Sequence, residues 1–531
     1  MPLNLLFQVE KAFLRAFYGD CGFSQFSLLT QLHHYNYISY MKKLDFVNGF
    51  FVLAAGFFLA SPLNAQTSEA ELAAHPEFTS SNYLVYPEPA NIRYTKAPAG
   101  YKPFYISHYG RHGSRYHHSS EEYTYLFETL SKADSENKLT ELGKQTLAYA
   151  KVLANKAAPR KGDLTQVGVR QHEGIANRMY KNFGDVFKDW KVGNKKITPH
   201  VKAYASTSGR CIVSMSAFMG ELRALNPKIK PELISGKSYM KFISAFDWGK
   251  LDYSKVKSYT NESDKLWKNV NPQPFLSKIF NDSNYVVKNI ETDKFYNRFF
   301  EIATSLQGMD KPLLDEIAAN TKVPADSFVN IFTTEEKIAR WKAQNAWWYS
   351  LEGTSPLINR PDGLNFAKPT LQNILDEADN AIAVDTTRIS PSTSTSTSST
   401  SSPTGSAYHS GTLKPIAATL RFGHDATLLP LAALMQLPVA NAKVSDLSKL
   451  HEQWNDFRII PMAANLQMIF YKAQSKPILV KILYNEIEQT LPVPCGVSDQ
   501  RRETKDERKC PTAPYYRWDD VREFYNALLK K

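Results

Sequence analysis

Residues 101–115, Tyr-Lys-Pro-Phe-Tyr-Ile-Ser-His-Tyr-Gly-Arg-His-Gly-Ser-Arg, decide the fold. Their first part, Tyr101–Tyr109, is rich in aromatic and apolar side chains, with Pro-Ala-Gly before it and Gly110 after it. Such a run, bounded by turn residues, predicts a buried strand. The strand ends at a glycine-containing turn that carries two arginines and a histidine. In α/β proteins chemistry gathers at the carboxyl ends of strands, so this turn is the first candidate site.

Further strands and helices alternate along the chain. Residues 119–187 have a helical pattern, in which Thr140 and Thr165 each stand at an expected N-cap. Ser206-Thr207-Ser208 is expected to cap a helix whose apolar face uses Ile212, Met215, Met219 and Leu222. Strands are predicted at 197–205, 416–422, 468–472 and 478–484, and later helices at 426–435 and 518–529. Strands that alternate with helices predict an α/β sheet.

The length of 531 residues is too great for one ordinary core. We expect residues 66–205 and 407–531 to form an α/β catalytic domain, with a helical excursion at about 119–187. Residues 206–388 are expected to form an inserted, mostly α-helical domain. The Ser/Thr/Pro tract at 389–406 cannot bury a core, so it is expected to be a disordered surface loop.

The amino-terminal region carries an export signal. Met41-Lys42-Lys43 precedes an apolar run from Phe50 to Ala60 and then Leu63-Asn64-Ala65. This order predicts a secretory signal peptide at 41–65, and an apolar run too short to span a membrane stably. Residues 1–40 would then be an over-extended leader. We therefore expect export to the periplasm, the cell surface or the medium.

Composition is that of a globular protein, with 43% apolar and 22% charged residues, and the formal net charge is +12. The positive charge favours anionic partners without choosing among nucleic acid, anionic lipid and small phosphorylated molecules. No motif for nucleic-acid binding accompanies it. The sequence leaves the oligomeric state open.

Four cysteines bear on compartment and metal binding. Cys495 and Cys510 bracket a polar loop and are expected to pair if the protein resides in an oxidising compartment. Cys211 lies in an apolar helical pattern, which favours a buried free thiol. Cys21 falls in the leader. No Cys/His spacing is typical of a zinc site.

The turn Arg111-His112-Gly113-Ser114-Arg115 places one imidazole between two guanidinium groups. Arginine is the side chain best suited to bidentate binding of phosphate. A neutral imidazole held among these cations can attack phosphorus, and the cations stabilise charge on the transferred oxygens. The alternative is a basic surface turn with an incidental histidine.

Two further candidates follow predicted strands. Arg210 lies in the first turn of a helix, where backbone N–H groups favour anions. His424-Asp425 follows the predicted strand 416–422, so a carboxylic acid there can protonate a leaving alkoxide and the histidine can bind phosphate. Taken alone, Arg210 is compatible with an ordinary surface residue, and His424-Asp425 with a capped helix start.

Together these residues resemble the histidine acid phosphatases, the second branch of the histidine phosphatase superfamily. The resemblance rests on the stretches 111–115, 164–171, 206–214 and 424–425, which occur in family order. It implies a Rossmann-like, phosphoglycerate-mutase-like α/β domain with an inserted α-helical domain, and neither cofactor nor metal. It also implies that His112 is the phosphorylated nucleophile, that Asp425 is the proton donor, and that the phosphate is bound by Arg111, Arg115, Arg210 and His424.

Two subfamilies share these features. Tyr116, Arg421-Phe422-Gly423-His424 and Leu428-Leu429-Pro430-Leu431 look like the multiple inositol polyphosphate phosphatases. That subfamily typically carries its proton donor two residues after the histidine, in His-Ala-Glu. Here Asp425 follows His424 directly and Ala426 occupies the glutamate position, which is the form of phytases and general acid phosphatases.

The resemblance predicts stepwise dephosphorylation of inositol polyphosphates such as phytate, so the expected partner is a phosphorylated small molecule. The alternatives are a broad-specificity acid phosphatase and, from another class, a catalytically silent binding protein of the cell surface. A further hypothesis is that lysines of the helical insert bind additional phosphates; the alternative is a solvated basic surface. The lysines in question are Lys237, Lys241, Lys250, Lys255 and Lys257.

Overall fold

The computed structural model describes residues 68–192, 195–198, 200–244, 260–357, 364–386, 415–496 and 510–530. The predicted leader, the signal peptide at 41–65 and the Ser/Thr/Pro tract at 389–406 lie outside these residues. No helix in this part of the chain is long and apolar enough to cross a membrane.

An eight-stranded sheet organises the fold, with the strand order β10-β8-β7-β1-β6-β4-β5 and β9 paired to β8. The parallel part comprises β1 (Lys102–Arg111), β6 (Ile416–Gly423), β4 (His200–Ala205) and β5 (Lys230–Ser235). The antiparallel part comprises β7 (Asn465–Lys472), β8 (Leu479–Tyr484), β9 (Ile487–Glu488) and β10 (Tyr516–Arg517). The predicted strands at 101–109 and 416–422 and the late strand pair are confirmed.

Register brings three strand ends to one edge of the sheet. Arg111 at the end of β1 is opposite Gly423 at the end of β6. Ala205 at the end of β4 is opposite Phe422. Because these three neighbouring strands are parallel, the turns that follow them emerge side by side.

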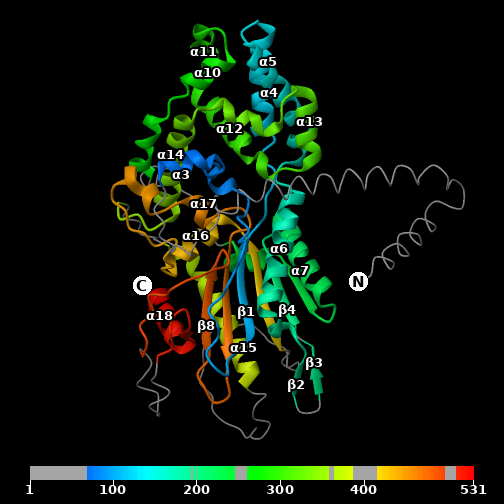
Figure 1. Ribbon diagram of the computed structural model, residues 1–531, viewed down its shortest axis with the longest axis vertical. Helices are drawn as coiled ribbons and strands as arrows, with labels where there is room; N and C mark the ends of the chain where they lie inside the picture. The colour runs from blue at the N-terminus through cyan, green and yellow to red at the C-terminus, as the bar shows by residue number, and fades with distance from the viewer. Residues whose placement is uncertain are drawn as a thin grey trace, which may run out of the picture. The chain divides into compact units, whose positions relative to one another are not determined.

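Helices cover both faces of the sheet (Figure 1). Tyr105 of β1 packs on the face covered by α15 (Lys368–Thr386), α16 (Asp425–Leu434) and α18 (Trp518–Lys530). The next residue, Ile106, packs on the opposite face, with α6 (Gln166–Phe183) and α7 (Gly209–Leu225). This burial on both faces explains why β1 is a nearly continuous apolar run rather than an alternating one.

A second core lies among helices near the upper end of Figure 1. Its aromatic centre includes Tyr149, Phe275, Phe295, Phe299 and Phe332. The helices that supply this core and flank it are α4 (Glu121–Ser135), α5 (Glu141–Val152), α10 (Gln273–Ile279), α11 (Ser283–Asn289), α12 (Thr292–Ser305) and α13 (Lys311–Thr321). The predicted helical excursion at 119–187 therefore belongs to two cores, because α4 and α5 pack with later helices while α6 packs on the sheet.

Shorter elements connect these layers. The long helix α14 (Thr334–Glu352) starts at a capping box formed by Thr333 and Glu336. It contacts α3 (Glu69–Ala74), α17 (Asp456–Ile459) and the 3-10 helix η1 (Pro76–Tyr83). The remaining short elements are α8 (Met240–Ile243) and the separate hairpin of β2 (Trp190–Val192) and β3 (Lys195–Ile197).

Three local expectations differ from the structure. The helical insert does not begin at 206, because α7 packs against α6 and β5 extends the sheet. The sequence of β5 gave no strand signal since this edge strand is largely exposed and contains Pro231. The second strand begins at His200 rather than Ile197, because Ile197 pairs with Trp190 in the separate hairpin. No serine side chain caps α7, whose N-cap residue is Ser208.

The Arg-His-Gly turn packs directly on the start of α6. Thr165 is the side-chain N-cap of α6, as predicted, and accepts a hydrogen bond from Gly168 N at 3.1 Å. A Cβ on Gly168 would overlap the backbone of Ser114, and a Cβ on Gly113 would overlap Gly168. The two glycines therefore allow a backbone-to-backbone contact that fixes the turn.

We predict that Gly168→Ala lowers the free energy of unfolding by about 1–3 kcal/mol, because backbone atoms of Ser114 cannot move aside freely. Urea unfolding monitored by circular dichroism measures the change. Gly220→Ala is the matched control, since Gly220 is an exposed helical glycine with open space around its Cβ position. It should stabilise the protein slightly, by about 0.5–1 kcal/mol. An unchanged stability in Gly168→Ala would contradict the packing account.

Candidate active site

The three strand ends meet at one cavity of about 970 Å³. It is lined by five of the six residues predicted for phosphate chemistry, namely His112, Arg115, Arg210, His424 and Asp425. The sixth, Arg111, is fully buried, and its Nη2 lies 2.7 Å from Asp425 Oδ2. Residues more than 300 positions apart in the chain therefore form a single cluster.

His112 is buried and fixed in one orientation. Its Nδ1 donates to Gly113 O at 2.9 Å, which leaves Nε2 as the nitrogen with a free lone pair in the neutral ring. Its backbone is held from both sides, because His112 N donates to Gly423 O and Ala463 N donates to His112 O, each at 3.0 Å. Burial, followed by the charges of Arg210, Arg111 and Arg115, holds the pKa of His112 well below its usual value. The imidazole is therefore neutral, as a nucleophile requires.

Asp425 is the carboxylate that balances this cationic cluster. Its Oδ2 accepts from Asn82 Nδ2 at 2.9 Å and pairs with Arg111. Burial alone would raise the pKa of Asp425. The charge of Arg111 and the hydrogen bond from Asn82 outweigh burial and hold that pKa well below its usual range. In the ligand-free protein Asp425 is therefore ionised.

His424 contacts both Arg210 and the His112 ring. Arg210 Nη2 donates to His424 Nδ1 at 3.4 Å, so the hydrogen of the neutral ring is on Nε2, 2.9 Å from Ser206 Oγ. The rings of His424 and His112 lie edge to face with centroids 5.5 Å apart. Burial and the charge of Arg210 lower the pKa of His424 to about 3. Both imidazoles are thus neutral donors or acceptors rather than cations.

Cys211 is a buried free thiol, as the sequence predicted, and burial raises its pKa to about 11. Its Sγ lies 3.3 Å from Gly423 O and 3.7 Å from His424 Nε2. A thiol with a raised pKa is unreactive, so it serves as packing behind His424. Cys495 and Cys510 are joined by a disulfide.

Arg115 is held by groups from two segments, the residues that directly follow it and the end of η1. Its Nη1 donates to Tyr116 O at 2.9 Å, and its Nη2 contacts His118 Nε2 and, at 3.4 Å, Tyr83 Oη. The guanidinium also lies over the Tyr83 ring, 5.2 Å from its centroid. Burial and the charge of Arg115 lower the pKa of His118 to about 3, so its Nε2 accepts this hydrogen bond.

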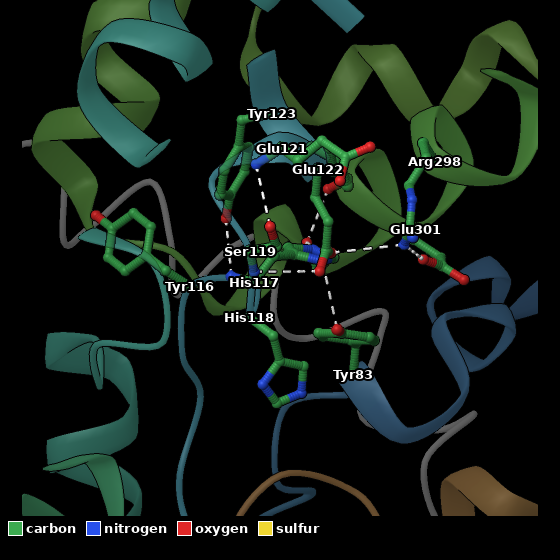
Figure 2. A network of polar contacts seen from close by, with 12 residues as sticks. Tyr83, Tyr116, His117, His118, Ser119, Glu121, Glu122, Tyr123, Arg298 and Glu301 are labelled. Carbon is green, nitrogen blue, oxygen red and sulfur yellow. Dashed lines mark hydrogen bonds and ion pairs between the residues drawn. The ribbon is translucent and has the colours of Figure 1, made fainter. Parts of the chain in front are cut away.

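A polar network extends from Tyr83 to the helical part of the chain (Figure 2). The Tyr83 ring stacks on His117 with centroids 4.7 Å apart. His117 Nδ1 donates to Glu122 of α4 at 2.6 Å, and its Nε2 lies 2.9 Å from Ser305 of α12. Arg298 of α12 lies 3.7 Å from Glu122. The orientation of Arg115 therefore depends on contacts with α4 and α12.

The outer part of the cavity contains further charged residues. Lys237 and Arg340 line it, and so does Glu301, which accepts from Arg340 Nη2 at 2.7 Å. Lys241 is not among the lining residues. Lys250, Lys255 and Lys257 lie outside the residues that the structure describes.

Within the described ranges no group of three or more His, Cys, Asp or Glu side chains is arranged to hold a metal ion. The charge available for binding an anion in this cavity comes from arginine and lysine.

Comparison with known proteins identifies the family. Residues 110–485 match the model of the histidine phosphatase superfamily (branch 2). The chain belongs to this superfamily. The matched segment contains the Arg-His-Gly turn, Arg210 and His424-Asp425, and membership supports phosphatase activity. No curated protein matches the chain significantly in sequence.

Solved structures of similar fold include two kinds of enzyme. The Bifidobacterium longum multiple inositol polyphosphate phosphatase in complex with inositol hexasulfate has a TM-score of 0.59 and 16% identity, covering 83% of this chain and 96% of its own. The complex of the same enzyme with phosphate has a TM-score of 0.58 and 16% identity, and the match covers 85% of this chain and 97% of that enzyme. The phytase from D. castellii has a TM-score of 0.53 and 13% identity, and the match covers 90% of this chain and 89% of the phytase. At these identities the likeness shows the fold, and it confirms the predicted α/β architecture with additional helices.

Sequence reasoning missed several residues that surround the site. Asn82, Tyr83 and Ser206 contact Asp425, Arg115 and His424. Asn82 and Tyr83 lie at the end of η1, before the first predicted strand, and no periodicity or spacing relates them to Asp425. His117 and His118 directly follow the Arg-His-Gly turn, so a search of that turn's neighbours for titratable groups would have found them.

We predict that Glu122→Gln lowers the free energy of unfolding at neutral pH by about 1–3 kcal/mol. Burial would raise the pKa of Glu122, but the hydrogen bond from His117 and the charge of Arg298 lower it to about 2. The stabilisation is therefore complete above the unfolded-state pKa near 4.5 and is lost as the pH falls from 4.5 toward 2.

Urea unfolding of wild type and variant at several pH values tests this. Their difference in unfolding free energy should be largest near pH 7 and should shrink in acid. Glu121→Gln, an exposed neighbour on α4, is the control and should change stability by less than about 0.5 kcal/mol. A difference between Glu122→Gln and wild type that does not vary with pH would contradict the assignment.

Proposed function

We propose that the protein is a phosphomonoester hydrolase that works through a phosphohistidine on His112. The observation that carries this proposal is the buried, neutral imidazole whose Nδ1 hydrogen is committed to Gly113 O. Nε2 is then available on a residue that lines the cavity. Three arginines close enough to depress its pKa surround it, and they suit a phosphate better than any neutral ligand.

Arg111, Arg115, Arg210 and His424 bind the transferred phosphate in this proposal. Buried guanidinium groups on different strand ends provide donors from several directions, which suits three equatorial oxygens. His424 lines the cavity beside Arg210, so its ring lies next to the proposed phosphate. Preorganised donors of this kind stabilise charge that develops in the transition state without rearranging.

The reaction proceeds in two displacements. His112 Nε2 attacks phosphorus, an N–P bond forms, the ester P–O bond breaks, and the leaving alkoxide takes a proton from Asp425. Water then attacks the phosphohistidine and the N–P bond breaks. Asp425 receives the water proton, so the products are the alcohol and inorganic phosphate.

Asp425 becomes a proton donor when substrate binds. In the ligand-free protein Arg111 keeps it ionised. A phosphate placed against Arg111 brings negative charge beside the carboxylate and disfavours its ionised form, which raises its pKa. Because the protonated form is needed for the first step, activity should be favoured at acidic pH and should decline as the pH rises.

Inositol polyphosphates such as phytate are the proposed substrates. The cavity is wide enough for more than one phosphate group, and Lys237 and Arg340 lie on its wall. Two proteins of similar fold are a multiple inositol polyphosphate phosphatase and a phytase. The alternative is a broad-specificity acid phosphatase of small phosphomonoesters. The ion pair between Arg340 and Glu301 favours this alternative, because it cancels one positive charge on the wall.

We further propose that the protein acts outside the cytoplasm, in the periplasm, on the cell surface or in the medium. The disulfide between Cys495 and Cys510 supports this compartment, because disulfides persist mainly in oxidising environments.

Product profiling with phytate and with an aryl phosphate tests the proposed function. Wild type should release phosphate stepwise from phytate, and raising the salt concentration should slow this reaction more than hydrolysis of the aryl ester. His112→Ala should lose activity on both substrates. Turnover of the aryl ester alone would favour the general acid phosphatase. Wild-type protein that hydrolyses neither would favour a binding protein, and an active His112→Ala variant would overturn the nucleophile.

A further inference from the structure

The end of η1, residues Ser81-Asn82, contacts the proton donor from outside the strand-end turns. Asn82 is nearly buried and lines the cavity. Its side-chain Nδ2 donates to Asp425 Oδ2 at 2.9 Å. Its backbone carbonyl accepts a hydrogen bond from Arg111 Nη1. One residue thus binds both members of the Arg111–Asp425 pair, and it precedes the segment 110–485 that matches the family model.

Arg111 is fixed so that only one guanidinium nitrogen faces Asp425. Its Nη1 donates to the carbonyls of Asn82 and, at 2.6 Å, Ile460. The remaining terminal nitrogen, Nη2, makes the 2.7 Å contact with Asp425. Asp425 Oδ2 therefore forms an ion pair with Arg111 and accepts a hydrogen bond from Asn82, while Oδ1 accepts from Ala426 N at 3.0 Å.

A buried anchor holds Asn82 in place. The preceding residue, Ser81, has φ 58° and ψ −131°, a conformation that is strained for a residue with a side chain. Its hydroxyl donates to Asp456, which is fully buried and also accepts from Trp341 Nε1 at 3.0 Å and Phe457 N at 2.7 Å. Strained conformations persist where the surroundings enforce them, and they occur most often at functional sites.

We propose that Asn82 is a positioning residue that orients Asp425 for proton transfer to the leaving group. This inference rests on the proposed function, because it assigns Asn82 to the same reaction. Asn82 acts through Asp425, by fixing the carboxylate plane and by sharing Oδ2 with Arg111. Ser81 and Asp456 hold Asn82 in the orientation that makes this contact.

The proposal separates two kinds of substrate. An alkyl phosphate expels a basic alkoxide, so its hydrolysis depends on a well-placed acid, whereas an aryl phosphate with an acidic phenol expels a stable phenolate without one. If Asp425 is no longer positioned by Asn82, hydrolysis of the alkyl ester should therefore slow more than hydrolysis of the aryl ester. Loss of fold or of phosphate binding should slow both esters alike.

The experiment measures kcat/KM for an alkyl phosphate and for a p-nitrophenyl ester with Asn82→Ala. We expect a loss of about tenfold or more on the alkyl ester and about threefold or less on the aryl ester. Glu77→Gln is the matched control, since Glu77 lies on the same 3-10 helix and is largely exposed, paired only with His75. It should leave both rates unchanged.

The pH profile is a second readout. Arg111, His424 and Arg115 face Asp425 together with Asn82, and all four favour its ionised form. Removing the Asn82 donor raises the pKa of Asp425. The limb on which kcat falls with rising pH reports the pKa of Asp425 in the enzyme–substrate complex, so it should move upward, by about one pH unit.

A double-mutant cycle with Asp425→Asn decides whether Asn82 acts through Asp425. In that background Asn82→Ala should change the alkyl rate by less than about twofold. An equal loss on both esters, or the same loss with and without Asp425, would overturn the proposal. If wild type hydrolyses both esters and Asn82→Ala behaves like Glu77→Gln, only the positioning role is wrong. If wild type hydrolyses neither ester, the proposed function is wrong and this inference fails with it.

Discussion

The contact between Arg111 and Asp425 is the interaction on which the rest of the site depends. Arg111 ends β1 and Asp425 begins α16, and their side chains meet at 2.7 Å where water is largely excluded. A buried guanidinium without a carboxylate would be costly, and so would an unpaired carboxylate. The pair balances charge next to His112, whose ring stays neutral because it is buried among cations. The same arrangement that balances charge in the cavity thus keeps His112 neutral and Asp425 ionised.

The parallel register of β1, β6 and β4 makes this cluster possible. Each of these strands is buried on both faces. The polar residues of the site therefore lie in the turn that follows the carboxyl end of each strand. The helices then orient the side chains of these turns. The start of α6 fixes the Arg-His-Gly turn through a glycine contact, and α4 and α12 reach Arg115 through Tyr83 and His117. The orientation of Arg115 and the packing of the helical part are therefore physically connected.

The sequence predicted those parts of the molecule whose signals are local. The buried strand at 101–109 and the Thr165 cap follow from composition and spacing within a few residues, and the structure contains both. The placement of Arg210 and His424-Asp425 beside His112 could be expected because parallel strand ends share an edge.

Non-local features escaped prediction. The edge strand β5 carries few buried apolar residues and so lacks the pattern of a strand. Asn82 contacts Asp425 across 343 positions of sequence. The strained backbone conformation of Ser81 could not be predicted, because a glycine would have indicated it and a serine does not. Such contacts are set by tertiary packing, which overrides local preference.

The measurement that most directly tests the central claim is a rapid acid-free quench of wild-type protein reacting with a radiolabelled phosphate ester. The account predicts a covalent phosphoenzyme with the label on His112, stable in base and labile in acid as a phosphoramidate is. The His112→Ala variant should remain unlabelled. A label on another residue, or rapid turnover with no covalent intermediate when the quench is fast enough to trap one, would contradict it.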